Sequence, residues 1–352
     1  MKNGWLLAIV WALTTSSIPH AVADVPAGSH PRLFMSAENL AAFKRNAETP
    51  RTAAATLVAD CQRTIDSPGF FNERCGAGGG VWPQAAMSCA FAYRVTQKAA
   101  YQAQAMKYLR AALDDDQTLG DKLGCTPGVS TDWRSWNGNQ PVPPVIITIS
   151  HDTGYPMRWY GPYVALAYDW LSGTPGVDAA LLGQARTCLT TWVDYYTERG
   201  YHHGEAGANY NAGFVIGKTL AGIAIGTDGG SDGHLWTETV TDLFPQLLIG
   251  KGLAGRSGAV GTAAGPMVGG DWAEGWQYGP LSVVEYAVAA RALEEHGVAL
   301  PEMDTWVNSL VVRYIHATVP KLDGHWIGGD FEPDRIYQSP SSNPLDAVLA
   351  GP

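Results

Sequence analysis

Charged side chains, and basic ones above all, are scarce in this chain of 352 residues. Asp, Glu, Lys and Arg make up 16% of it, against 46% hydrophobic residues, so we expect a large folded core and not a mainly disordered chain. There are 33 Asp and Glu against 23 Lys and Arg, which gives a net charge of −10. This acidic balance argues against nucleic acid or an anionic membrane as a partner. An acidic polymer stays compatible with it as a substrate, because a local cluster of Arg and Lys is enough to bind one.

Several common motifs of metal and nucleotide sites are missing. The five cysteines form no CxxC pair, and no histidine lies at ligand spacing from them, which argues against a zinc site. No Gly-x-Gly-x-x-Gly sequence follows a strand pattern, so a nucleotide site of that kind is not indicated. We therefore expect neither a metal nor a cofactor, with calcium at the carboxylates of residues 228–232 as the alternative to a solvated turn there. We also expect one or two disulfides with one thiol left over. The cysteines are Cys61, Cys75, Cys89, Cys125 and Cys188.

Long apolar runs are missing too, apart from one near the start of the chain. Lys2 precedes an apolar run over residues 5–13, and Ala21-Val22-Ala23 follows with the small residues of a cleavage site. The run is too short to cross a bilayer, which needs about 20 apolar residues. We therefore predict a signal peptide over residues 1–23, export to the periplasm or beyond, and one domain over residues 24–352 without a membrane span.

Strand patterns are sparse, and helical periodicity dominates the rest of the chain. Residues 120–160 lack periodicity and should form a long loop, in which VIITIS could be a short strand. No fixed-period repeat is present, which argues against a regular solenoid. We predict an all-α fold, an incomplete (α/α) toroid of helical hairpins with few short strands and with its loops gathered at one end as a cleft. Helices are expected after the N-cap Ser36 and over residues 52–65, 83–96, 99–113, 161–170, 178–198, 212–226, 235–248 (kinked or ended early by Pro245), 281–296 and 303–317.

Aromatic residues are plentiful, with 13 Trp and 15 Tyr, and they gather in the stretch GGDWAEGWQYGP at residues 269–280. Flat aromatic faces around polar groups suit a cleft that binds sugars, and packing in the core is the alternative for each ring. Glu274 lies between two of these rings and could support a bound sugar. The tryptophans that we consider for stacking on sugar are Trp133, Trp136, Trp272 and Trp276.

Four stretches of the sequence resemble the heparinase II/III-like and alginate-lyase-like polysaccharide lyases. They are HPRLF from residue 30, RWYGPYVALAYDWLSG from residue 158, GANYNAGFVIGKTLAGIAIG from residue 207 and GGDWAEGWQYG from residue 269, in the order expected for the family. The resemblance implies an (α/α) toroid that cleaves polysaccharides containing uronic acid by β-elimination. Family members usually continue into a β-sandwich, and residues 24–352 are expected to hold the toroid part alone. In the family the Asn of the third stretch is often followed by His, whereas here Asn209 is followed by Tyr210.

Elimination beside a uronate has three chemical requirements. The carboxylate must be neutralised, a base must remove the C5 proton, and an acid must protonate the O4 leaving group. Asn209 suits the first role, with a helix N-cap as the alternative, and Asn211 competes for either. Tyr278 is the candidate for base, acid or both, with a cleft-lining or buried tyrosine as the alternative. His202 and His203 could share the proton transfer, or could be a surface pair.

Arg158 and the neighbouring Tyr160 are candidates for contact with substrate. A guanidinium can hold a carboxylate with two parallel hydrogen bonds, so Arg158 could bind the uronate. The alternative for Arg158 is an ion pair with Asp152 or Asp169. The expected partner is an acidic polysaccharide or oligosaccharide.

Two other functions stay open at this point. An inverting glycoside hydrolase on a similar toroid needs two carboxyl groups about 6.5–9.5 Å apart. Asp271 or Glu274, paired with Asp330 or Glu332, could supply them. A non-catalytic glycan-binding protein would keep the aromatic cleft and lack a working base.

Overall fold

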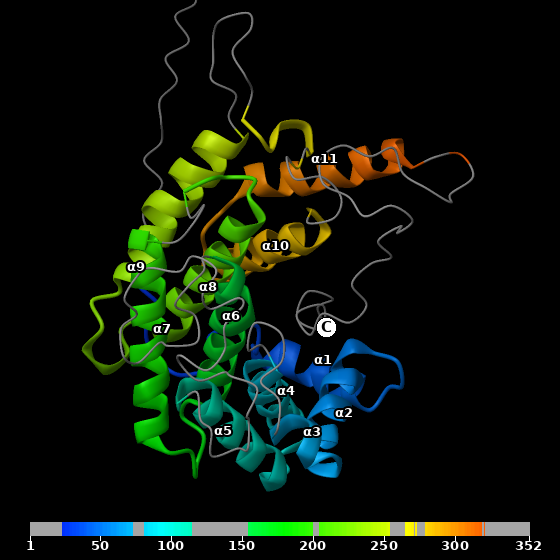
Figure 1. Cartoon of the computed structure of the whole chain (residues 1–352), viewed down its shortest axis with the longest axis vertical. Coiled ribbons are helices and arrows are strands. Elements are labelled where there is room, and N and C mark those ends of the chain that lie inside the picture. Colours follow the sequence, from blue (N-terminus) through cyan, green and yellow to red (C-terminus); the bar gives the residue numbers. More distant parts are fainter. Residues whose placement is uncertain are drawn as a thin grey trace, which may run out of the picture.

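Every regular element in the described part of the protein is a helix (Figure 1). The computed structural model describes residues 23–72, 81–114, 154–199, 204–253, 265–270, 272, 279–318 and 320. No β-strand occurs within these ranges, so the all-α prediction is confirmed for them. The predicted strand VIITIS and residues 1–22 of the predicted signal peptide lie outside them.

The helices agree with the predicted pattern over most of the described chain. Ser36 and Thr52 cap the first two, because their hydroxyl oxygens accept hydrogen bonds from the N–H groups of Asn39 and Ala55. Shorter elements are the 3₁₀ turns η4 (Asp228–Gly230) and η6 (Val268–Gly270) and the π-helical segment η5 (Thr239–Leu253). The α-helices are α1 (Ala37–Ala47), α2 (Ala53–Asp66), α3 (Pro68–Asn72), α4 (Val81–Thr96), α5 (Ala99–Asp114), α6 (Gly154–Leu171), α7 (Ala179–Arg199), α8 (Asn209–Ile225), α9 (His234–Glu238), α10 (Gly279–Glu295) and α11 (Pro301–Ala317).

The predicted loop is wrong over residues 154–160, and so is an early helix end at Pro245, for which a kink was the other predicted outcome. Helix α6 begins at Gly154, so residues 154–160 are helical and Pro162 lies inside the helix. Pro245 does not end its helix, which continues as η5 to Leu253. In both places burial outweighs the cost of proline in a helix: Met157 and Tyr160 are in the core beside Pro162, as Phe244 and Leu248 are beside Pro245.

Helices α4, α6, α8 and α10 are neighbours in that order, with α6 and α8 at the centre of the described structure (Figure 1). Near the start of α6 and α8, Arg158 contacts Asn209, and at their far ends Tyr168 bonds Asp228. These two helices are therefore parallel. Helix α10 runs in the same direction. Asn211 at the start of α8 bonds Tyr286 in α10. His296, just after α10, bonds the main-chain oxygen of Arg32, whose side chain caps the end of α8.

The helices between these neighbours lie outside them. Helix α7 packs on α6 and α8, and its C-terminal half returns to the start of α6, where Trp192 and Tyr160 are in edge contact. Helix α5 packs on α4 and α7. The parallel helices α6, α8 and α10 thus have their N-terminal ends at one end of the molecule, and α7 lies between α6 and α8 in the chain and packs on both.

The axes of α6 and α8 come close where two glycines face each other. A Cβ atom on Gly161 would lie 2.9 Å from the Cα of Gly217, inside contact distance of the facing backbone. Glycine at 161 also lacks the Cβ that would clash with the ring of Pro162, which helps the helix to pass through proline. The close approach brings the side chains of α6 and α8 together along their length.

We expect Gly161→Ala to lower the free energy of unfolding by about 1–3 kcal/mol, because neither backbone can move without separating the helices. The control is Gly183→Ala in α7, where a Cβ would meet nothing within 4 Å. That change should stabilise the helix by about 0.5–1 kcal/mol. Thermal unfolding of both variants measures the difference, and equal melting temperatures would contradict the close packing.

A disulfide joins Cys61 in α2 to Cys89 in α4. This agrees with the expectation of one or two disulfides. Cys188 is buried in α7 and takes no part in the bridge, and Cys75 and Cys125 lie outside the described residues. Among the described helices, none is long and apolar enough to cross a membrane.

Candidate functional site

The N-terminal ends of α6, α8 and α10 bring together several of the predicted site residues. Arg158 lies in the second turn of α6, and Asn209 and Asn211 lie in the first turn of α8. The first turn of each helix points its N–H groups and the positive end of the helix dipole to this end of the molecule. Negative charge is therefore favoured here.

Arg158, Asn209 and Glu285 form one buried cluster. The Nη1 of Arg158 donates to the side-chain oxygen Oδ1 of Asn209 at 3.3 Å, and its Nη2 donates to the main-chain oxygen of the same residue. On its other edge, Arg158 faces Glu285, with Nη2 2.9 Å from Oε2 and Nε 2.9 Å from Oε1. The side chains of Arg158 and Glu285 are 1% and 3% exposed. The cluster is thus a desolvated ion pair with a carboxamide attached to it.

Burial raises the pKa of Glu285 to about 7, and the charge and hydrogen bonds of Arg158 act against that rise. Each member of such a buried ion pair depends on the other. Removing one leaves an uncompensated buried charge and lowers the free energy of unfolding by about 3–5 kcal/mol. Glu285 therefore keeps Arg158 in place, and Arg158 in turn contacts Asn209.

Two alternatives for these residues are wrong. Asn209 is not a helix N-cap, because Ala208 occupies that position and Asn209 is the first helical residue. Arg158 pairs with Glu285 and not with Asp169, which lies at the opposite end of α6; Asp152, the other partner considered, lies outside the described residues. Glu285 escaped the sequence analysis, although a lone carboxylate among the apolar residues of LSVVEYAVAARAL was a signal that could have found it.

Asn211 and Trp272 are also buried at this end. The side chain of Asn211 donates to the hydroxyl of Tyr286 at 2.9 Å. Trp272, 4% exposed, packs against Tyr286 and Trp306, with ring centroids 5.7 and 6.4 Å away. Tyr160 is buried against Trp192. The structure therefore places these three candidates within the core that surrounds the Arg158 cluster.

The other candidates lie outside the described residues. The proposed proton-transfer groups are Tyr278, His202 and His203. The proposed sugar contacts are Trp133, Trp136, Glu274 and Trp276, and the carboxylates of the hydrolase alternative are Asp271, Glu274, Asp330 and Glu332. Trp272 and the start of α10 at Gly279 flank residues 273–278 in the chain.

A second buried cation lies further along α8. Lys218 is 3% exposed, and its Nζ contacts Glu238 at 2.5 Å and Thr197 at 3.3 Å. Beside it is a cavity of about 440 Å³ between α7, α8, α9 and η5, lined also by Phe214 and Lys251. Lys218 contacts Glu238 and Thr197, whereas Arg158 contacts Asn209 and Glu285, so the two buried cations of α6 and α8 serve different neighbours.

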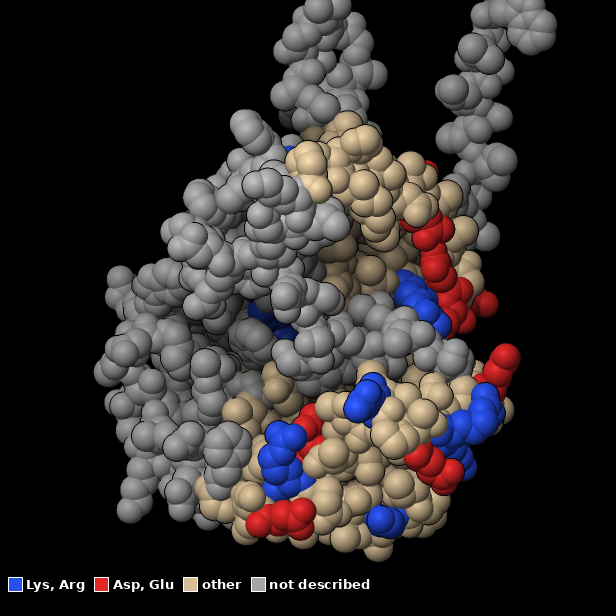
Figure 2. Space-filling view, turned by 90° about the vertical axis from the view of Figure 1, so that its right-hand side faces the viewer, with Lys and Arg blue, Asp and Glu red and all other residues tan. Residues whose placement is uncertain are grey.

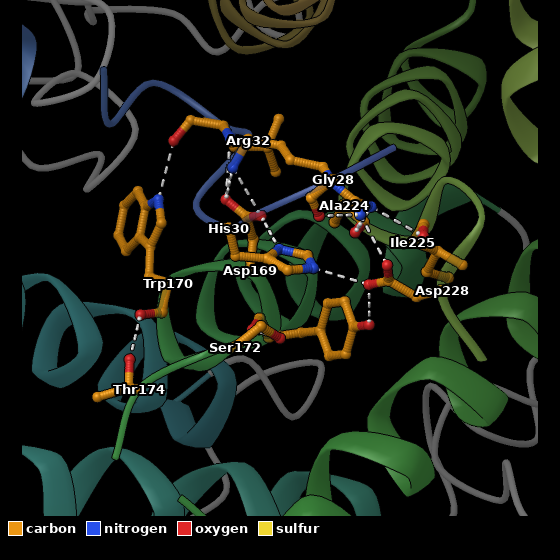
Figure 3. A network of polar contacts seen from close by, with 12 residues as sticks. Gly28, His30, Arg32, Asp169, Trp170, Ser172, Thr174, Ala224, Ile225 and Asp228 are labelled. Atoms are coloured by element: carbon orange, nitrogen blue, oxygen red, sulfur yellow. Dashed lines mark hydrogen bonds and ion pairs between the residues drawn. The ribbon is translucent and has the colours of Figure 1, made fainter. Parts of the chain in front are cut away.

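A further network of polar contacts lies at the opposite end of α6 and α8 (Figure 3). The imidazole of His30 lies between two carboxylates, with Nδ1 2.6 Å from Asp169 and Nε2 2.7 Å from Asp228. Arg32 bonds Asp228 and the carbonyl oxygens of Ala224 and Ile225. These bonds satisfy carbonyl groups at the end of α8 and tie the segment before α1 to two helices.

The carboxylate of Asp169 is fully used within this network. It accepts hydrogen bonds from the N–H groups of Arg32 and Leu33 at 2.9–3.0 Å, in addition to the contact with His30. Burial alone would raise the pKa of Asp228, but hydrogen bonds from Tyr168, Arg32 and His30 outweigh it and lower that pKa. These bonds around a fully buried carboxylate stabilise the fold, so we assign His30 a structural role.

We expect His30→Ala to lower the free energy of unfolding by about 2–3 kcal/mol, because the fully buried side chain of Asp169 loses a partner. A matched control is His234→Ala, since His234 also lies between two aspartates, Asp194 and Asp232. These aspartates are 46% and 77% exposed, so that loss should be about 0–1 kcal/mol. Urea unfolding compares the two, and equal losses would contradict the structural role.

The charge over the described part of one face is mixed. Figure 2 shows basic and acidic side chains interspersed there, without a field of one sign. Recognition of an acidic ligand on this face would thus depend on individual basic side chains and not on a broad positive surface. Comparison with protein-family models and with curated proteins finds no match to this sequence.

Proposed function

We propose that this protein is an exported polysaccharide lyase that cleaves a glycan containing uronic acid by β-elimination. The observation that carries the proposal is the place of Asn209. Its carboxamide is tied to a buried Arg–Glu pair where three parallel helices direct their positive ends. A rigid amide in such a field suits the neutralisation of a carboxylate.

The arrangement of the helices supports an (α/α) toroid as the scaffold. The neighbours α4, α6, α8 and α10, of which the last three are parallel, alternate along the chain with helices such as α5 and α7 that pack on them. Successive helical hairpins produce this order when the first helix of each hairpin packs against the first helix of the next. The resemblance of the four sequence stretches points to the same scaffold, and two of them lie on α6 and α8.

In the proposed reaction Asn209 donates a hydrogen bond to the substrate carboxylate as negative charge builds on it. Tyr278, alone or with His202 or His203, removes the C5 proton. The electron pair of the C5–H bond forms a C4–C5 double bond, and the C4–O4 bond breaks. O4 leaves with a proton from the same group or its neighbour. The products are one chain whose new non-reducing end is an unsaturated uronate and a second chain with a new reducing end.

Export is supported by the predicted signal peptide and by the bridge between Cys61 and Cys89. Disulfides persist in oxidising compartments such as the bacterial periplasm. A periplasmic or secreted lyase would meet its polymer there.

An absorbance assay tests the proposal. The protein is incubated with alginate, heparan sulfate and hyaluronan, and the absorbance of the unsaturated uronate is followed, because only elimination produces that chromophore. At least one polymer should yield it. New reducing ends without this absorbance would support the hydrolase alternative instead, and binding without cleavage would support a glycan-binding protein.

A further inference from the structure

We infer that the cavity beside Lys218 binds a neutral sugar unit, at a site separate from the Asn209 cluster. The cavity holds about 440 Å³ and lies where α7, α9 and η5 pack on α8 (Figure 1). That volume is within the range of about 300–1,000 Å³ that is usual for small-molecule sites. Such a site goes beyond the proposed function and does not depend on lyase activity.

The cavity lies on the opposite side of α8 from Asn209. Lys218 comes nine residues after Asn209, and at 3.6 residues per turn nine residues make about 2.5 turns. The two side chains therefore leave opposite sides of the helix. Their contacts agree, because Asn209 meets Arg158 of α6 whereas Lys218 meets Glu238 of α9. A ligand in the cavity would thus bind apart from the Arg158 cluster.

The π-helical form of η5 supplies one wall of the cavity. Asp242, Gln246, Leu247 and Lys251 all line it. Asp242 and Lys251 are nine residues apart, so in an α-helix they would face opposite sides. The i→i+5 bonding of a π-helix widens each turn, and nine residues then make about two turns, which returns Lys251 to the side of Asp242. Turns of this kind are rare and frequently occur at functional sites.

The cavity offers both donors and acceptors to a ligand. Among the described residues, Glu238 and Thr197 take two of the three N–H groups of Lys218, at 2.5 and 3.3 Å, which leaves one for a ligand. Glu238 uses Oε2 in that pair, and its Oε1 bonds none of the described residues. The Oε1 of Gln246 likewise accepts from no residue that the structure describes. Exposed Lys251 adds further donors.

The charges of the cavity favour a neutral ligand. Two lysines and two carboxylates line it, so the charges cancel; they are Lys218, Lys251, Glu238 and Asp242. An anionic ligand at Lys218 would lie beside the carboxylate of Glu238, and a cationic ligand at Glu238 would lie beside the ammonium of Lys218. A neutral group leaves this pair intact, and the buried side chain of Lys218 keeps its partner.

A sugar matches these features. Each hydroxyl can accept one hydrogen bond and donate another, so a single hydroxyl can bridge the Nζ of Lys218 and the Oε1 of Glu238. Phe214, Leu243 and Leu247 give the cavity an apolar wall, against which the C–H face of a sugar ring can pack. Bonds to charged groups are the stronger ones, so Lys218 and Glu238 should provide most of the affinity.

Methyl NMR tests the site. The probes are the methyl glycosides of glucose, galactose and mannose, each compared with its uronate and its 2-amino form. The reporters are the methyl signals of Leu247, identified by their loss in Leu247→Met, which keeps the volume of the side chain. At least one neutral glycoside should shift these signals saturably and bind more tightly than its two charged forms. No shift with any neutral glycoside, or binding of a charged form that is as tight, would overturn the inference.

Lys218→Met tests the place of binding. It should raise the Kd of the neutral glycoside on the order of tenfold or more, because a hydrogen bond from a charged group is lost. Glu238 is 42% exposed, so water replaces its partner. The matched control is Arg110→Met, which removes a cation paired with Asp178 ahead of α7, away from the cavity. That variant should bind as the wild type does. Unchanged binding in Lys218→Met, or equal weakening in the control, would contradict the site.

Gln246→Ala replaces Lys218→Met if that variant does not fold, because Gln246 is an exposed residue of the cavity wall. It should raise the Kd about fivefold, and an unchanged Kd would again contradict the site. None of these measurements uses turnover. A protein that binds the glycoside and cleaves no polymer would keep the sugar site and lose the proposed function, and a lyase without the methyl shifts would do the reverse.

Discussion

Tyr278→Phe should lower the formation of unsaturated uronate by about 10²–10⁴-fold while oligosaccharide binding stays close to that of the wild type. The reason is that phenylalanine keeps the ring and loses the only proton-transferring atom, and general acid–base catalysis contributes rate factors of that size. Turnover is measured by absorbance and binding by titration calorimetry.

Tyr101→Phe is the control for the loss of a tyrosine hydroxyl. The hydroxyl of Tyr101 bonds Gln62 between α2 and α5, away from the Arg158 cluster. That variant should keep wild-type turnover. Full activity in Tyr278→Phe would remove Tyr278 from the reaction and move the role of base to His202 or His203.

Asn209→Ala should lower kcat by about 10²–10³-fold. A preorganised hydrogen-bond donor at the point where charge develops has that effect on rate when it is removed. Alanine also favours the helix, so the start of α8 should keep its structure. The measurement is kcat and KM on the cleaved polymer, together with the melting temperature.

Asn211→Ala is the informative comparison, because Asn211 lies two residues further along α8 and was the competing candidate. Its side chain bonds the hydroxyl of Tyr286 in the core. We expect it to lose stability by about 1–3 kcal/mol and to keep most of its kcat. A large loss of kcat in Asn211→Ala with little loss in Asn209→Ala would exchange the two roles.

The sequence stretches that resemble the lyase family divide between the two ends of α6 and α8. At one end, His30 of HPRLF binds Asp169 of AYDWL, and Arg32 caps α8. At the other, Arg158 binds Asn209. The same two helices therefore carry a network that stabilises the fold and the cluster that we propose to position the substrate. The expected losses differ accordingly, in stability for His30→Ala and in kcat for Asn209→Ala.

The sequence by itself determined that the described chain is helical and where most helices begin and end. Periodicity, caps such as Ser36 and the scarcity of strand patterns are local signals, so they can be read without a structure. It also singled out Asn209, from the resemblance and the chemistry of elimination, and Arg158, as a cation able to hold a carboxylate. Local rules did not predict the helical residues 154–160 or the continuation past Pro245 to Leu253, where the burial of neighbouring side chains outweighs the cost of proline in a helix.

Only the tertiary structure decided which side chains meet. Arg158, Asn209 and Glu285 are 51 and 76 residues apart in succession along the chain, and no local pattern pairs residues over such separations. They meet because α6, α8 and α10 are parallel neighbours in a shared core, with the glycines at 161 and 217 allowing the close approach of α6 and α8. The same packing turned the proposed substrate ligand Arg158 into the partner of a buried glutamate, since a guanidinium removed from water requires a carboxylate beside it.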